Sequence, residues 1–415
     1  MAVAVAWLMT ATALTGLAAA LVSARIGAPP FAGEWRIVGP WRAAPAIVVA
    51  AVVAITTRMA AVTRAPWRGL LVGSMLAALA WAATLALVDG PSGLLGSLGG
   101  RYDYLAALPD AVSAGSFLER FVPEHTGWPT HVQSHPPGMV LLLIGLDTVG
   151  LAHAGVVAAI VLVCGAAAVP AALVAVRDAA GEPTARRAAP MLVLVPAAIW
   201  WSSADALFAG VAAWAVALAV LATGRRGRAS WLMAVAAGGL GAATLLLSYG
   251  LVLLAAVPLA VAAWRRRLAP LNATVIVLAI VYIGLRATGF DWWAGFEAAR
   301  AAYDRGASGD RPYVLFVVAN LVVFAVAVGP AAVAGLHRLL RARRFTPVLL
   351  LAGAAAAAVL GADVSGLSKG EVERIWLPFV PWVAVGAAAL ARPRPWLVAN
   401  GVTAVTLALL LEARW

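Results

Sequence analysis

The chain has 415 residues, of which 63% are hydrophobic and only 12% are charged, and its mean hydropathy is +0.93. Average soluble domains carry roughly 25% charged residues, so this composition excludes a soluble globular protein. The net charge of +12 would suit a nucleic-acid-binding protein, but the arginines stand in short clusters between apolar runs. That distribution orients membrane proteins, and with no basic soluble domain we expect no nucleic-acid partner.

Apolar runs of about 20 residues, enough to cross roughly 30 Å of hydrocarbon, recur along the chain. The sequence therefore predicts an all-α polytopic membrane protein, a single transmembrane domain over residues 1–415. A barrel is excluded because the runs are continuous, whereas barrel strands alternate. With the arginine clusters on the cytoplasmic side, we expect about 13 spans, at residues 3–22, 43–60, 67–88, 154–176, 188–203, 206–223, 230–248, 250–264, 270–288, 313–336, 345–362, 376–391 and 395–411.

Two rare residue types add to this interpretation. Cys164 is the only cysteine, so an intrachain disulfide and a cysteine metal cluster are both excluded. Lys369 is the only lysine in a chain rich in Arg, Ala, Gly and Val, which is typical of a GC-rich bacterial genome. The expected location is the plasma membrane, crossed several times.

The most polar stretch is the loop 89–153, which follows the third predicted span and is expected outside. Ionisable groups are rare near membrane spans unless they have a function, so we expect the active site in this loop. Its segment 136–151 is apolar but short, which favours a juxtamembrane helix over a span. The ionisable residues of the loop include Asp103, Asp110, Glu119, Glu124, His125, His131 and His135.

Asp103 and Asp110 follow the glycine-rich stretch 96–100 and lie seven residues apart, so a helix would place both on one face. A carboxylate on a partly buried loop beside the membrane can have its pKa tuned and act as a general base. The alternative is that the two acids cap or solubilise a surface helix. We favour a functional role for Asp103 over one for Asp110.

The second half of the loop combines carboxylate and imidazole groups, which can ligate a divalent metal ion. Glu124 and His131 are the candidate metal ligands, although their spacing matches no known metal motif and Pro129 interrupts any helix that would align them. No other cofactor is suggested. His135 precedes Pro136-Pro137, which hold an extended backbone, so its imidazole could contact a phosphate or a sugar hydroxyl.

Charged residues also stand at the ends of two later spans. Asp205 precedes the predicted span 206–223, where it could serve as a helix cap or stand beside Asp103 in an active site. Lys369, Glu371 and Arg374 precede the predicted span 376–391. Such a run is often only a solvated span end, but lysine and arginine are also the residues that hold phosphate.

Several motifs of soluble enzymes are missing, namely the nucleotide-binding phosphate loop, GxSxG and HExxH. Nothing in the sequence suggests a pump driven by ATP. A group donor, if the protein uses one, must come from the membrane or from the outer compartment.

Four motifs lie between about residues 100 and 380, and all four are predicted to be on the outer side of the membrane. They are Tyr104 with Gly115 and Pro136-Pro137, then Ser203-Ala204-Asp205-Ala206-Leu207-Phe208, Ser248-Tyr249-Gly250, and Glu373-Arg374-Ile375-Trp376-Leu377-Pro378. This combination resembles the GT-C superfamily of membrane glycosyltransferases, and within it the protein O-mannosyltransferase and aminoarabinose-transferase group. The first loop of that group usually begins with Asp-Glu four residues before the tyrosine, where this chain has Gly100-Arg101. Asp103 must then be a displaced catalytic acid, or another residue is catalytic.

The resemblance implies a GT-C-like bundle with juxtamembrane helices in the first outer loop. It implies transfer, with inversion, of a mannosyl- or arabinosyl-type sugar from a polyprenyl-phosphate donor to an envelope acceptor, which is a glycolipid, polysaccharide or protein. Asp103 would be the general base, and Asp205 would orient the acceptor or a metal ion. The residues expected to contact substrate are Tyr104, Asp110, His135, Lys369, Glu371 and Arg374.

Two other classes of function stay open on the sequence alone. A transporter or flippase for a lipid-linked substrate would also need many spans, although it predicts inverted repeats and polar residues near mid-membrane. Most charges of this chain lie at the ends of predicted spans instead. A non-catalytic scaffold of the cell envelope would not need the outer carboxylates.

Overall fold

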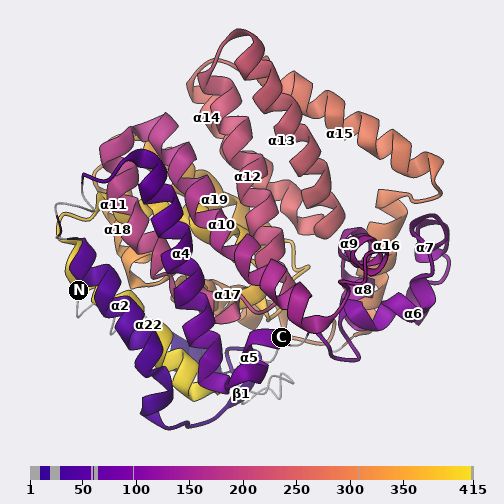
Figure 1. Ribbon diagram of the computed structural model, residues 1–415, viewed down its shortest axis with the longest axis horizontal. Coiled ribbons are helices and arrows are strands. Elements are labelled where there is room, and N and C mark those ends of the chain that lie inside the picture. Colours follow the sequence, from indigo (N-terminus) through magenta and orange to yellow (C-terminus); the bar gives the residue numbers. More distant parts are fainter. Residues whose placement is uncertain are drawn as a thin grey trace.

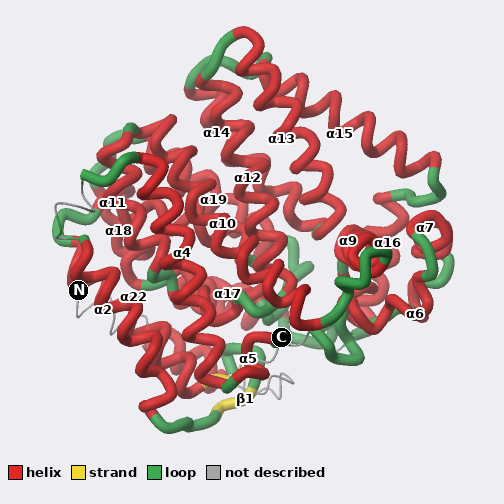
Figure 2. The backbone as a smooth tube through the Cα atoms, viewed as in Figure 1, coloured by secondary structure: helices red, strands yellow, loops and turns green. Residues whose placement is uncertain are grey.

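The computed structural model describes residues 10–18, 29–57, 59, 64–96, 98–306 and 308–412. In these residues the chain is almost entirely helical, as Figures 1 and 2 show. The strands of this part are two residues long, β1 (Glu34–Trp35) and β2 (Leu411–Glu412), and they pair antiparallel. This pair joins the two ends of the described chain.

Six helices are long and apolar enough to cross a membrane, which confirms a multi-pass helical membrane protein. Five of them are α10 (Ala154–Ala180), α12 (Ala204–Gly224), α13 (Gly227–Leu247), α15 (Pro270–Ala287) and α19 (Pro347–Val364). The sixth is α4 (Trp67–Ala86) together with the 3-10 turn η2 (Leu87–Asp89). A bent pair, α17 (Tyr313–Val328) and α18 (Pro330–Arg341), forms a seventh span if counted as one.

The expected number of about 13 spans is not confirmed. Four expected spans fall on short or interrupted helices, and the helix at 393–410 does not pass the same test of length and hydropathy. Only residues 10–18 of the expected span 3–22 are described, and they are helical. The short or untested elements are η1 (Pro40–Ala43), α2 (Ala44–Thr56), α11 (Glu182–Val193), η5 (Pro196–Trp200), η6 (Tyr249–Ala255), α14 (Ala256–Trp264), η7 (Leu377–Phe379), α21 (Val380–Ala384), η8 (Val385–Ala389) and α22 (Pro393–Leu410).

The bend between α17 and α18 has a clear local cause. Gly329 takes a φ of +88°, which favours glycine, and Pro330 begins the next helix where no backbone N–H is needed. The two helices therefore meet at 105°. The Asn400 side chain of α22 accepts a hydrogen bond from Ala331 N at 3.1 Å and so satisfies a free N–H of α18.

The centre of the bundle is the packing of α12 against α10. In α12, 83% of the spanning window is buried, against 67% in α10 and 6% in α15 at the edge of the molecule (Figure 1). Both central helices are rich in alanine and glycine, which lets their backbones approach closely. At Gly210 the approach is so close that a Cβ would lie 2.0 Å from the Cys164 carbonyl oxygen.

The loop 89–153 folds into a series of short helices, in keeping with the expected juxtamembrane helices. Its apolar segment forms a ten-residue helix, α9, as the sequence suggested. In Figure 1, α6 to α9 gather with α16 beyond the lower ends of α13 and α15. The elements of the loop are α5 (Pro91–Leu95), η3 (Tyr104–Ala107), α6 (Leu108–Ala111), α7 (Ala114–Phe121), η4 (His125–Gly127), α8 (Thr130–Ser134) and α9 (Gly138–Asp147). Two later helices, α16 (Trp292–Arg305) and α20 (Val372–Ile375), also help to form the site described below.

The contact at Gly210 gives a prediction for stability. Gly210→Ala should lower the melting temperature, because the added methyl group overpacks the α10–α12 contact at a cost of about 1–3 kcal/mol. Gly239→Ala in α13 is the matched control, since its Cβ would meet no atom within 4 Å and alanine favours the helix. Thermal unfolding of both variants in detergent checks this, and equal melting temperatures would contradict it.

Candidate active site

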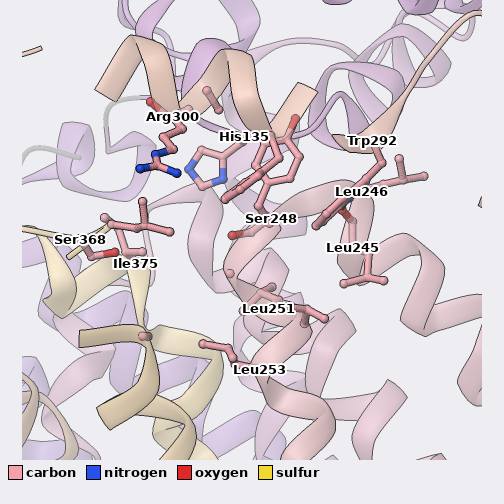
Figure 3. Close-up of a pocket in the computed structure, with 18 of the residues that line it drawn as sticks. His135, Leu245, Leu246, Ser248, Leu251, Leu253, Trp292, Arg300, Ser368 and Ile375 are labelled. Atoms are coloured by element: carbon pink, nitrogen blue, oxygen red, sulfur yellow. The ribbon is translucent and has the colours of Figure 1, made fainter. Parts of the chain in front are cut away.

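A cavity of about 1030 Å³ lies where three polar segments of the chain meet. Its wall includes residues from the loop 89–153, from α16 and from the loop between α19 and α20, and Figure 3 shows part of it. The polar residues that line the cavity include Tyr102, His131, Ser134, His135, Ser248, Arg300, Tyr303, Ser368, Lys369, Glu371 and Arg374.

The other part of the cavity is an apolar groove between η6, α13 and α15. Leu245, Leu246, Leu251 and Leu253 contribute to its wall (Figure 3). Val252 and Val275 also line the groove, yet they are 50% and 60% exposed, so the groove opens sideways onto the apolar surface of the protein. A lipid chain can therefore enter from the bilayer while its headgroup stays at the polar end.

Arg374 connects α12 to the loop that precedes α20. Its guanidinium donates to Asp205 Oδ2 at 2.9 Å and to Glu371 Oε2 at 2.7 Å, and both Arg374 and Asp205 are buried. Burial alone would lower the pKa of Arg374, but Asp205 and Glu371 outweigh it and raise that pKa, so the cation is permanent. Arg311 lies 4.0 Å from the second Glu371 oxygen. Two arginines and two carboxylates thus balance within this cluster.

Asp205 was expected either to cap α12 or to belong to the site. Ser203 is the N-cap of α12 and makes no side-chain capping hydrogen bond, while Asp205 lies in the first turn and pairs with Arg374. A buried carboxylate without a cation would be costly, so this pair fixes the loop onto α12.

Asn320 holds the same loop from the other side. Its side-chain amide donates to the Ser368 carbonyl at 2.7 Å and to Asp363 Oδ1 at 2.9 Å, and its oxygen accepts from Gly370 N at 3.1 Å. Glu371 takes a left-handed φ of 61°, which is uncommon outside glycine and needs such support. The strained residue is the one that contacts Arg374.

Asp103 lies behind His131 and not in the cavity wall. Its Oδ1 accepts from Tyr104 N at 2.6 Å, so it caps η3, as one alternative proposed. Its Oδ2 lies 3.2 Å from His131 Nδ1, and His131 lines the cavity whereas neither Asp103 nor Asp205 does. Since an ionised carboxylate only accepts, Nδ1 carries the proton and the lone pair of neutral His131 is on Nε2.

Tyr104 lies close enough to both Asp103 and Asp205 to feel their charges, and these are the two carboxylates that the sequence suggested for one site. Its ring contacts those of His131, His135 and Phe208, with centroids 5.9 to 6.3 Å apart. Burial, followed by the charges of Asp205 and Asp103, raises the pKa of Tyr104 well above its ordinary value. Tyr104 is buried and does not line the cavity, so it supports the site from within.

His135 lines the cavity, and its Nδ1 lies 3.2 Å from the Leu247 carbonyl oxygen. Burial lowers the pKa of His135 to about 4, so the ring is neutral. A carbonyl can only accept, so Nδ1 holds the proton and Nε2 is an acceptor. His135 can therefore accept from a sugar hydroxyl but cannot donate to a phosphate in this state.

Three other predicted residues have different surroundings. Asp110 is exposed and does not line the cavity, and its backbone carbonyl accepts from Arg120. Glu124 is exposed and forms a two-pronged pair with Arg120, whereas His131 pairs with Asp103. The described residues contain no group of three His, Cys, Asp or Glu side chains that could hold a metal ion. The predicted ligands Glu124 and His131 therefore have separate partners.

Sequence reasoning missed the roles of Asn320 and Arg300 and the pairing of His131 with Asp103. A signal was present for Asn320, since it is the one polar side chain within the apolar helix 314–328, and such residues usually have a partner. The His131 pairing depends on how the loop folds back, because 28 residues separate the two partners.

Glu373 gives a prediction for pH dependence. It is buried beside the cluster, its Oε1 accepts from Ala32 N at 2.7 Å, and burial raises its pKa to about 7. The folded protein then holds a proton that the unfolded chain releases above its ordinary pKa near 4.5. Stability from this group is thus full at low pH and falls by about 3 kcal/mol as pH rises to about 7.

Glu373→Gln keeps the acceptor for Ala32 and removes the charge. The variant should melt higher than the wild type at pH 8 and at nearly the same temperature at pH 5. Glu34→Gln, at an exposed position, should change neither value. If Glu373→Gln leaves the difference between the two pH values as large as in the wild type, Glu373 does not titrate in this range.

Comparison of the chain with known protein families, with curated proteins and with solved structures finds no match. The likeness to GT-C enzymes therefore rests on the four sequence motifs, and function has to be argued from the residues of the cavity.

Proposed function

We propose that the protein is an inverting glycosyltransferase that uses a polyprenyl-phosphate sugar as donor and an envelope molecule as acceptor, on the outer face of the plasma membrane. The observation that carries the proposal is a single cavity that joins the His131–Asp103 pair to an apolar groove open toward lipid. Transfer from a lipid-linked donor needs both parts. The isoprenoid tail stays in the bilayer, while the sugar has to reach an acceptor in water or among the lipid headgroups.

The proposed reaction assigns contact with the acceptor to His131. Its Nε2 takes the proton from the acceptor hydroxyl as that oxygen bonds to the anomeric carbon of the sugar. The bond between the anomeric carbon and the phosphate oxygen breaks at the same time, and the polyprenyl phosphate leaves with the electron pair. Asp103, which the sequence suggested as the direct base, holds the imidazole by Nδ1 and stabilises its charged form, as a positioning residue.

The ion-pair cluster gives this site its shape. Asp205 and Arg374 hold the loop 365–371 against α12, so Glu371 and Lys369 face the cavity at fixed positions. His135 accepts a hydroxyl of the donor sugar, as its proton placement allows. Preorganised groups of this kind contribute to catalysis because they need no rearrangement when charge develops.

The proposal predicts that His131→Gln and Asp103→Asn both lose activity. We expect sugar transfer from radiolabelled polyprenyl-phosphate mannose or arabinose in membranes to fall about 100-fold or more, the range of general-base catalysis. In Asp103→Asn, kcat should fall without a change in KM for the donor. The pH profile of transfer should also shift, because His131 loses the carboxylate that holds its ring. His153→Gln, at an exposed histidine, is the control and should retain full activity.

Full activity in His131→Gln would remove His131 as the base. Full activity in Asp103→Asn would remove Asp103 from the reaction. If the folded wild type transfers no sugar from a broad panel of donors but exchanges a lipid-linked substrate between leaflets, the transporter or flippase is correct instead.

A further inference from the structure

We propose that Arg300 and Lys369 form the anion-binding part of the cavity and hold the phosphate of a lipid phosphate. Its assignment to the sugar donor rests on the proposed function, but the anion site itself rests on charge and geometry. The sequence instead placed the donor phosphate at Arg374, with Lys369 and His135. The structure leads to a different distribution of roles.

The charges around the cavity are only partly balanced. Arg374 and Arg311 are matched by Asp205 and Glu371, so this cluster has no net charge to offer an anion. Arg374 also has its guanidinium directed to those two carboxylates. The positive charge that the cavity presents therefore comes from the two remaining cations in its wall, Arg300 and Lys369.

Arg300 has no competing carboxylate in the part of the chain that the structure describes. Among the described residues it forms no ion pair with a carboxylate, although Glu297 and Asp304 lie about one turn away on α16. Neither of those acids lines the cavity, whereas Arg300 does. Figure 3 shows the Arg300 side chain extending from the helix into the cavity, toward the side where His135 and Ser368 lie.

Lys369 lines the same cavity from the loop between α19 and α20. Its Nζ donates to the Gly309 carbonyl at 2.6 Å and lies 5.8 Å from the centre of the Tyr303 ring. Tyr303 follows Arg300 by three residues on α16, so Lys369 lies beside a residue one helical turn from Arg300. A lysine ammonium has three donors, which leaves donors for a ligand.

Aromatic side chains lie beside Arg300 in the cavity wall. Trp292 and Phe296 precede Arg300 on the same face of α16 and line the cavity, with rings nearly parallel and centroids 6.2 Å apart. The apolar groove continues from there along α15. An arginine fork and a lysine suit the oxygens of a phosphate, and the neighbouring apolar wall suits the chain attached to it. The chemistry thus fits an amphiphile with a phosphate head.

The test measures binding without transfer. Purified protein in nanodiscs of zwitterionic lipid is titrated with radiolabelled polyprenyl monophosphate that carries no sugar. Arg300→Gln and Lys369→Gln should each weaken binding about 10- to 100-fold, as expected when a hydrogen bond between charged groups is lost. Arg305→Gln makes the same change of charge on the same helix at a residue outside the cavity wall, and it should bind like the wild type.

Two competitors identify the ligand. Polyprenol, which lacks the phosphate, should bind weakly and equally to wild type and Arg300→Gln. Inorganic phosphate should compete only at far higher concentration, and competition as strong as that of the lipid would make the site one for free phosphate.

Wild-type affinity in both Arg300→Gln and Lys369→Gln, or no binding by the wild type, would overturn the proposal. If the wild type binds the lipid phosphate but transfers no sugar, the proposed function alone is refuted.

Discussion

The contact on which the site depends is the ion pair between Arg374 and Asp205, with Glu371 as the second partner of the arginine. It joins α12, the most buried of the six candidate spans, to α20 and the loop before it, and 169 positions of the chain separate the two partners. Breaking a buried pair leaves an unmatched charge, which costs about 3–5 kcal/mol, so the loop has one favoured position. The position of the loop determines where Lys369 and the strained Glu371 lie in the cavity wall.

Close packing of helices holds the frame of this molecule together, while charged groups position the loops of the site. The α10–α12 contact uses glycine and alanine to bring two backbones together, and Asp178 of α10 pairs with Arg225 at the end of α12. The polar network lies at one end of that frame, where helices begin and loops cross. Rigid helices thus support loops that carry the chemistry, and α15, which is hardly buried, leaves one wall of the cavity open to lipid.

Much of this could be predicted from the sequence, and the limits have physical reasons. Hydropathy gave the helical membrane class and six of the spans, because long apolar runs have one stable form in lipid. Other expected spans fall on shorter helices where a proline interrupts the run, as at Pro196. In the structure Asp205 pairs with Arg374, and His135, Lys369 and Arg374 line one cavity. Charge balance was out of reach, since whether Arg374 or Arg300 is matched by a carboxylate depends on side-chain partners that no spacing reveals.

The hydrogen bond from Ala32 to Glu373 spans 341 positions of the chain, and β1 pairs with β2 over a still longer separation. During synthesis the N-terminal segment therefore enters the membrane long before its partners exist. Its contacts with Glu373 and β2 can form only after almost the whole chain has left the ribosome. Assembly of the cavity is then a late event of biogenesis, and a chain truncated before α20 would insert its early helices without completing the site.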